Sequence, residues 1–295
     1  MKRCYLFVFS FFICSSVYSA NDKGFLWEVS SALNTVYLMG SIHFADKSIY
    51  PLRKEIDEAF NRSDHLVVEL DATSISADEY QLFVLEKGSY NNGKTIADVL
   101  SPETMQQLRL QLKELNVSYE AVSHYKPGIL VLTLSAIQIV QMGLDPALGI
   151  DAYFLQKTTT QSDKEVIELE TLEQQLNLFI DIPDGELLLK ESLYSLDDSV
   201  LLMQDMMRFW KQGDEEKMNQ LLFEDALTDY PEFSKIYDGL IYARNKTMTA
   251  KVDAMLQQQS ATKEIFFVVV GTGHLIGEQG IVNALKKKGY TVKRR

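Results

Sequence analysis

The chain has 295 residues, of which 46% are hydrophobic and 24% are charged, and its formal net charge is -12. This composition is typical of a globular protein, because disordered chains have fewer apolar residues and coiled coils are richer in Ala, Glu, Lys and Arg. The acidic balance argues against nucleic acid as a partner and against docking on an anionic membrane surface, since both select basic surfaces.

The first segment in chain order has the pattern of a secretory signal peptide. Two basic residues after Met1 precede an apolar run, Cys4–Val17, and the small residues Ser19 and Ala20 offer a cleavage site. The run is shorter than the roughly 20 apolar residues that span a bilayer. We therefore predict a signal peptide at residues 1–19, a periplasmic or secreted location, and no stable membrane anchor after cleavage.

The mature chain is expected to lack thiols. Both cysteines, Cys4 and Cys14, fall in the predicted signal peptide. This excludes disulfides, a cysteine nucleophile and cysteine-ligated metals from the mature protein. Its net charge would be -14, because cleavage removes two basic residues and no acidic ones.

The predicted strands lie toward both ends of the mature chain, with a largely helical block between them. Strand-length apolar runs occur at Thr35–Met39, Leu66–Leu70, Glu165–Leu169, Ile265–Val270 and Tyr290–Lys293. Helical periodicity is found at Leu52–Phe60, Glu103–Leu115, Gly128–Met142, Glu186–Lys211, Phe233–Gln258 and Gly280–Lys288. We therefore predict an α/β (α+β) fold for residues 20–295: a single domain with a central mixed sheet, built from both chain ends, and a large helical insertion.

Two of the four histidines share one local frame, a strand that runs into Gly-x-x-His. These are His43, after Gly40, and His274, after Gly271. Side chains just beyond the carboxyl ends of strands face the crevice where α/β sheets bind ligands. Both histidines are therefore candidate site residues, although each could instead hydrogen-bond to loop backbone. His65 and His124 are interpreted as structural or solvated.

Glu69 lies near the end of a buried strand, where a carboxylate is costly unless it is paired, protonated or bound to a cation. The alternative is an outward-facing glutamate on an edge strand. Two imidazoles and one carboxylate are the ligand set of a divalent-metal site with an open position. His43, Glu69 and His274 are therefore predicted metal ligands.

Four further residues are candidates for the site, and each also has a structural interpretation. Arg244 could hold a substrate carboxylate or stabilise an oxyanion, or it could tie its helix to the acidic end of the sheet. Glu170 could border the same crevice or cap the helix that follows it. Ser41 and Thr272 lack the Gly-x-Ser-x-Gly setting of a nucleophile, so turn hydrogen bonds are the favoured interpretation.

Several motifs together resemble the TraB/GumN family, which is itself similar to the Tiki metalloproteases. They occur in the family's order along nearly the whole mature chain: Gly40-Ser41-Ile42-His43, Val67-Val68-Glu69-Leu70-Asp71, Gly149-Ile150-Asp151, Leu169-Glu170-Thr171, Arg244-Asn245 and Gly271-Thr272-Gly273-His274-Leu275. One departure is that Lys126-Pro127 is followed by Gly128, where the bacterial pattern has Pro-Trp, so we expect the substrate-facing rim to differ.

The resemblance implies an α/β core like that of the erythromycin esterases and related haem-uptake proteins. It also implies that His43, His274 and Glu69 serve metal-dependent peptide cleavage, with manganese, cobalt or zinc as the divalent ion.

We expect an exported metal-dependent hydrolase that acts on a peptide or a small acyl substrate, using His43, Glu69, His274 and Arg244. Whether Glu69 is a ligand or the base is left open. The alternative is a non-catalytic protein that binds a secreted peptide or an envelope or exopolysaccharide component. The sequence does not determine the oligomeric state.

Overall fold

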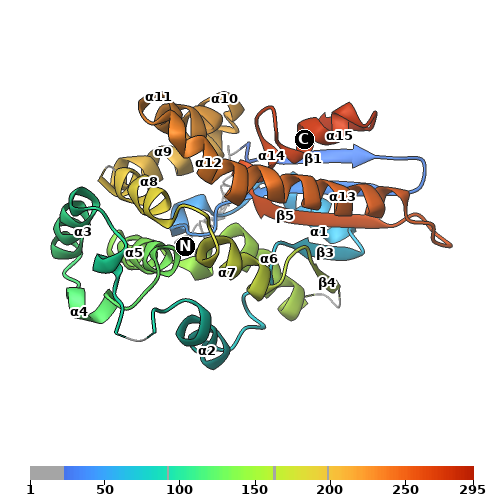
Figure 1. Cartoon of the computed structure of the whole chain (residues 1–295). Coiled ribbons are helices and arrows are strands. Elements are labelled where there is room, and N and C mark those ends of the chain that lie inside the picture. The colour runs from blue at the N-terminus through green and yellow to red at the C-terminus, as the bar shows by residue number, and fades with distance from the viewer. Residues whose placement is uncertain (1–22, 92, 162–163, 198) are drawn as a thin grey trace, which may run out of the picture.

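The computed structural model describes residues 23–91, 93–161, 164–197 and 199–295 (Figure 1). The predicted signal peptide and both cysteines lie outside the described residues. Within the described part, no helix combines the length and the hydropathy needed to cross a bilayer.

Six strands form one mixed sheet in the order β4-β3-β5-β2-β1-β6. Strands β4, β3, β5 and β2 run parallel to one another, whereas β1 is antiparallel to both of its neighbours, β2 and β6. The first two strands come from the start of the chain and the last two from its end, which confirms the predicted α/β fold with a mixed sheet. The strands are β1 (Leu26–Ser30), β2 (Thr35–Ser41), β3 (His65–Val68), β4 (Glu165–Glu168), β5 (Ile265–Gly271) and β6 (Thr291–Arg294).

The register of the central pair aligns the two Gly-x-x-His segments. Every residue of β2 pairs with one of β5, from Thr35 opposite Ile265 to Ser41 opposite Gly271. Strand β3 flanks β5 on its other side, with Val68 opposite Val269. The carboxyl ends of the three strands therefore meet at the same edge of the sheet, as predicted.

Helices cover both sides of the sheet and bury its apolar strands, as parallel sheets require. Helices α1 (Lys54–Arg62) and α6 (Ile150–Gln161) bring Phe60 and Phe154 to within 5.0 Å of each other, measured between ring centroids, and both rings pack on Phe267 of β5. Helix α13 (Ala243–Gln257) lies along the opposite side of the sheet from α1 in Figure 1 and adds buried residues such as Val252 to the same core.

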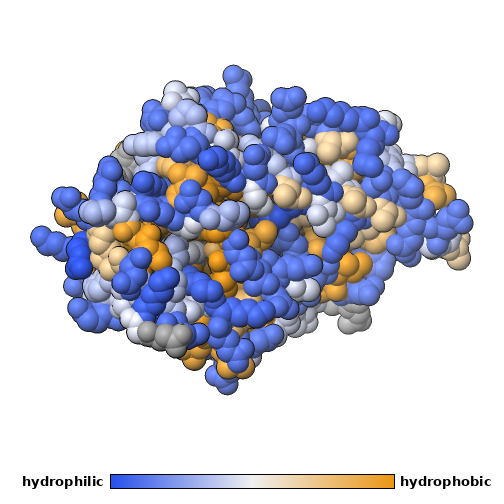
Figure 2. Space-filling view, viewed as in Figure 1, coloured by the Kyte–Doolittle hydropathy of each residue, from blue (hydrophilic) through white to orange (hydrophobic). Residues whose placement is uncertain are grey.

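A second hydrophobic core lies among the helices of the middle of the chain, including Leu108, Leu130 and Leu189. These helices gather at the end of the molecule that faces the carboxyl ends of the central strands (Figure 1), and apolar residues are visible in patches over them (Figure 2). The helices that contribute to this core are α3 (Pro102–Glu114), α4 (Tyr119–Val122), α5 (Pro127–Gln141), α7 (Leu172–Ile180), α8 (Gly185–Asp197), α11 (Asp225–Asp229) and α12 (Ser234–Tyr237). The middle of the chain also contains α2 (Ala77–Lys87), and α9 (Ser199–Gln212) and α10 (Glu215–Asn219), which place Phe209, Trp210 and Met218 in the core of the sheet.

Three elements differ from their predictions. The helix predicted over Glu186–Lys211 is two helices, α8 and α9. The helix predicted over Phe233–Gln258 contains a π-helical segment, Asp238–Tyr242, between α12 and α13. Strand β1 was not predicted, and its burial depends on pairing with β2 and β6. Two short helices, α14 (Thr272–Leu275) and α15 (Ile281–Lys287), follow β5.

Candidate functional site

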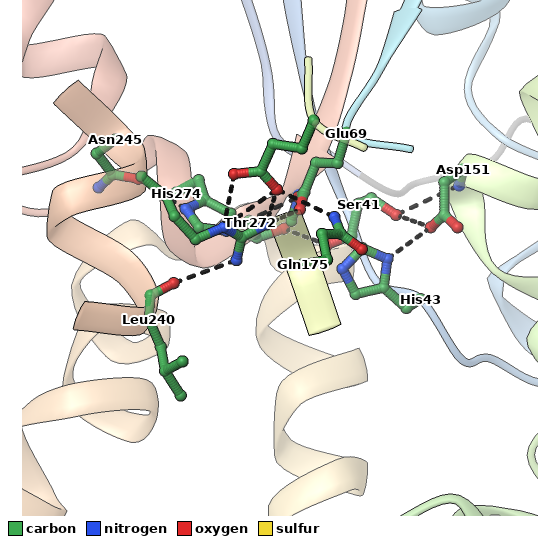
Figure 3. Close-up of polar contacts among 12 residues, drawn as sticks. Ser41, His43, Glu69, Asp151, Gln175, Leu240, Asn245, Thr272 and His274 are labelled. Carbon is green, nitrogen blue, oxygen red and sulfur yellow. Dashed lines mark hydrogen bonds and ion pairs between the residues drawn. The ribbon is translucent and has the colours of Figure 1, made fainter. Parts of the chain in front are cut away.

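The site lies where β2, β3 and β5 end. His43 follows β2 by two residues, Glu69 follows β3 directly, and His274 lies in α14, three residues beyond β5. A Cβ atom placed on Gly271 would lie 3.3 Å from His43 Nε2, 3.4 Å from Glu69 Oε1 and 3.6 Å from His274 Cδ2. The structure therefore brings the three predicted residues around one small hollow that a side chain at Gly271 would fill (Figure 3).

His43 lies at the solvent side of this hollow, with 49% of its side chain exposed. Its Nδ1 is 3.0 Å from Asp151 Oδ1, which also accepts a hydrogen bond from the Ser41 hydroxyl. Desolvation would lower the pKa of His43, but the Asp151 carboxylate outweighs it and, with Glu69, raises the pKa to about 9. In the protein without a bound ion, His43 is therefore an imidazolium at neutral pH.

His274 is buried and has the opposite electrostatics. Asn245 donates its Nδ2 proton to the Gln279 carbonyl over 2.9 Å, so its Oδ1, 2.6 Å from His274 Nδ1, accepts from the ring. The Nδ1 atom therefore carries the proton, and the Nε2 lone pair is left free, 3.8 Å from Glu69 Oε1. Burial lowers the pKa of His274 to about 4, which makes this ring neutral at pH 7.

Glu69 is buried and bound on both oxygens. Oε1 accepts the Gly271 N–H over 2.6 Å, and Oε2 accepts from Arg244 Nη2 over 2.5 Å. Burial would raise the pKa of Glu69, but the neighbouring His274, His43 and Arg244 lower it to about 2. The residue is therefore a carboxylate at neutral pH.

Arg244 links Glu69 to Glu170 and lies just after the π-helical segment. It binds Glu170 through Nε (2.9 Å) and Nη2 (2.7 Å), and its Nη1 donates to the Leu240 carbonyl over 3.1 Å. Gln175 of α7 completes the cluster with a 3.1 Å bond to Glu170. Because both carboxylates already bind Arg244, the geometry favours a role in positioning Glu69 over one in holding a substrate carboxylate.

The other residues considered in the sequence analysis have structural roles. The Thr272 hydroxyl donates to the Ser41 carbonyl over 2.9 Å, which joins the two turns. His65 begins β3 at the far end from Glu69, with its ring 4.9 Å from that of Phe266, and His124 lies in a loop. Glu170 borders the site, whereas Thr171 is the residue that caps α7.

Sequence reasoning assigned no role to Asp151 or Asn245, the two residues that bind the Nδ1 atoms of the histidines. Both occur in the motifs quoted for the family resemblance. A polar residue in such a motif was the available signal, but only the fold shows which histidine each one reaches.

The donor set has the composition of a divalent-metal site: two imidazoles, each with Nδ1 bound and Nε2 directed inward, and one carboxylate. In the part of the chain that the structure describes, no three His, Cys, Asp or Glu side chains stand close enough to hold one ion as they are. The three residues are therefore of the types that bind a divalent metal ion, but their side chains would have to move closer to one another to bind the same ion.

Comparisons with known proteins show which proteins the chain resembles over most of its length. The chain is 27% identical to the uncharacterized protein YbaP of Escherichia coli over 251 residues, which are 85% of this chain and 87% of that protein. It is 22% identical to the metalloprotease TIKI2 of Xenopus tropicalis, covering 92% of this chain and 59% of that protein. A TIKI homolog of Amphimedon queenslandica is 35% identical over 80 residues, 26% of this chain and 15% of that protein.

No solved structure shows a significant match to the chain. The model of the TraB/PrgY/gumN family matches residues 25–294, which include all three residues around the Gly271 hollow and both of their Nδ1 partners. The chain therefore belongs to the TraB/PrgY/gumN family.

Proposed function

We propose that the protein is an exported, metal-dependent hydrolase that cleaves a peptide bond or another acyl bond. The observation that carries the proposal is the convergence of His43, Glu69 and His274 around Gly271, from three strands that are far apart in the sequence. The likeness to proteins named as metalloproteases supports it at the level of the reaction class.

In this proposal His43, Glu69 and His274 hold the divalent ion. Manganese, cobalt and zinc all suit such a mixed nitrogen and oxygen ligand set. When bound, the ion would supply the Lewis acidity that polarises the acyl carbonyl.

The pKa of Glu69 supports one of the two roles that the sequence left open, ligand or base. A general base works best with a pKa near the working pH, and a pKa of about 2 makes Glu69 a weak base. Glu69 is therefore assigned to holding the cation, with Arg244 and the Gly271 N–H fixing its two oxygens. His43, the half-exposed member, is the residue that first meets an incoming substrate.

A pocket of about 350 Å³ offers room for the rest of the substrate. It lies between the start of α5, the end of α7 and the start of α8, and its lining includes Lys126 and Phe179. Phe179 is one helical turn beyond Gln175, which binds Glu170. Helix α7 therefore contributes both to the Glu170 cluster and to the wall of the pocket, whose size is within the range of ligand pockets.

The test is the Gly271→Ala variant, which adds one methyl group to the centre of the hollow. The backbone at Gly271 accommodates alanine, since its φ of -49° is allowed for any residue. We expect the unfolding free energy to change by less than about 1 kcal/mol, because no backbone strain arises and the nearest neighbour, the half-exposed His43 ring, can shift by a few tenths of an ångström. Metal content after chelator-free purification and peptidase activity should both fall at least about tenfold, as when a site is blocked sterically.

The matched control is Gly239→Ala, whose added methyl group meets nothing within 4 Å and which should keep both properties. A wild-type protein without stoichiometric metal would contradict the metal assignment. Full activity in Gly271→Ala would contradict the location of the site.

A non-catalytic binding protein is the second candidate. The observation that favours it is the bonding of Glu69, both of whose oxygens are already engaged by Arg244 and Gly271. Peptide binding measured by calorimetry that survives Gly271→Ala, without cleavage by the wild type, would favour this function.

A further inference from the structure

The two histidines of the site have different partners on their Nδ1 atoms. His274 is bound to the neutral amide of Asn245, whereas His43 is bound to the carboxylate of Asp151. A carboxylate can only accept a hydrogen bond, so it requires a proton on Nδ1 of His43. Nothing in the reaction proposed above assigns a role to Asp151.

Two backbone contacts fix Asp151 beside His43. The Ile150 N–H donates to the Ile42 carbonyl over 3.0 Å, which joins the segment after β2 to the start of α6. At Gly149 an added Cβ would lie 2.4 Å from the His43 carbonyl oxygen, so only glycine allows this approach. The two segments are thus held in direct backbone contact.

The side chain of Asp151 is fixed by the hydrogen bonds between this residue and the Ser41 hydroxyl. Ser41 Oγ donates to Asp151 Oδ1 and also accepts the Asp151 N–H over 3.3 Å, so one hydroxyl binds both ends of the residue. The carboxylate therefore has one orientation, and that orientation directs His43 Nε2 toward the Gly271 hollow.

We propose that Asp151 is a positioning residue, which holds His43 with its proton on Nδ1 and its Nε2 facing the reacting groups. The inference rests on the proposed function for its catalytic meaning, but the geometry of the ring is testable without catalysis. Carboxylates that orient metal-binding imidazoles act in this way, and their loss costs about 10- to 100-fold in metal affinity or activity.

The first experiment determines the tautomer of His43 by two-bond 1H–15N correlation in metal-free protein labelled on histidine. The chain has only four histidines, and a His43→Gln variant assigns the signal. Spectra are recorded above pH 9, where His43 is neutral. We expect the Nδ1–H tautomer in the wild type and a mixture in Asp151→Asn, because an asparagine amide can also donate to the ring.

The second experiment measures the dissociation constant for Co²⁺ or Zn²⁺ by competition with a chelator. Asp151→Asn should weaken binding about 10- to 100-fold, and Asp151→Glu should recover part of it. The control is Asp145→Asn, an exposed capping residue six positions earlier whose carboxylate binds only the Ala147 N–H among the contacts described.

Three outcomes decide the proposal. An Nε2–H tautomer in the wild type, or identical spectra for wild type and Asp151→Asn, would overturn it. A thermal midpoint that falls in Asp151→Asn with an unchanged tautomer would show a purely structural role and would also overturn it. If the wild type binds no metal, the proposed function fails, while the tautomer measurement still decides the role of Asp151.

Discussion

At the scale of single residues, the site shows how burial and partners give identical side chains different chemistry. His43 and His274 follow the same Gly-x-x-His pattern, yet the pKa is about 9 in one and about 4 in the other. The difference arises because an exposed ring beside the Asp151 carboxylate is stabilised as a cation, whereas a buried ring beside the Asn245 amide is not. One site therefore contains a charged and a neutral imidazole.

The Glu69→Gln variant tests how much the second charged residue of the site, the Glu69 carboxylate, contributes to stability. Glutamine has one oxygen, so either the Gly271 N–H or Arg244 Nη2 must face an amide NH₂ in place of an acceptor. Losing one charge-assisted hydrogen bond should lower the unfolding free energy by about 1.5–3 kcal/mol, measured by urea denaturation. Arg244 keeps Glu170, which limits the loss. An unchanged midpoint would show that the Glu69–Arg244 bond contributes nothing to stability.

At the scale of helices and strands, close backbone contacts position the site. Helices α5 and α7 approach closely at Gly128, where an added Cβ would lie 2.0 Å from the Phe179 carbonyl oxygen, the shortest such distance at any described glycine. Helix α7 also carries Gln175 to Glu170. Gly128, the residue after Pro127, is therefore part of the contact through which α7 reaches the site.

The Gly128→Ala variant should separate α5 from α7. Overpacking of this kind typically costs about 1–3 kcal/mol, and we expect the upper end because the obstacle is backbone. Gly239→Ala, in open space within a helical segment, should instead raise stability by up to about 1 kcal/mol. Equal midpoints for the two variants in a denaturant titration would contradict this account of the α5–α7 contact.

Helix α8 contains two glutamates whose pKa values are shifted in opposite directions. Burial raises the pKa of Glu191, although Tyr237 and Ser195 donate to it. Burial would also raise the pKa of Glu186, but hydrogen bonds from Ser101 and Thr104 outweigh it and lower that pKa. Helix α8 therefore loses stability from one carboxylate and gains it from the other at neutral pH.

The Glu191→Gln and Glu186→Gln variants should change the stability of the protein at neutral pH in opposite directions. A raised folded pKa means that Glu191 costs stability above its ordinary pKa of 4.5, so Glu191→Gln should be more stable than the wild type at pH 7. A lowered folded pKa gives Glu186 the reverse effect, so Glu186→Gln should be less stable at pH 7. In thermal unfolding, the Glu191→Gln difference should vanish as the pH falls toward 4.5, whereas the Glu186→Gln difference should shrink only as the pH falls below 4.5. Shifts of the same sign would contradict the pKa directions.

At the scale of the whole molecule, the sheet joins the two ends of the described chain. Strand β6 pairs with β1, and the Arg294 guanidinium lies 4.0 Å from the centroid of the Trp27 ring. The same sheet places the β2 and β5 ends together, so assembly of the site requires most of the domain.

The predicted signal peptide is tested by the N-terminal residue of the mature chain. Intact-mass spectrometry of the periplasmic or secreted fraction should give a chain that begins at Ala20, because residues 1–19 have the charge and apolar pattern that the export machinery recognises. The cytoplasmic precursor is the control. A mature protein that retains Met1 would contradict the cleavage.

The sequence by itself determined the fold class and the candidate residues of the site, because strand-length apolar runs that end in Gly-x-x-His or in Glu69 are local patterns. Only the tertiary structure decided that Asp151 and Asn245 bind the two histidines and that Arg244 binds both Glu69 and Glu170. The physical reason is separation: these partners are 29 to 175 residues apart, so their contacts depend on strand order and helix packing. The pKa of each histidine follows from those contacts, and no local pattern contains it.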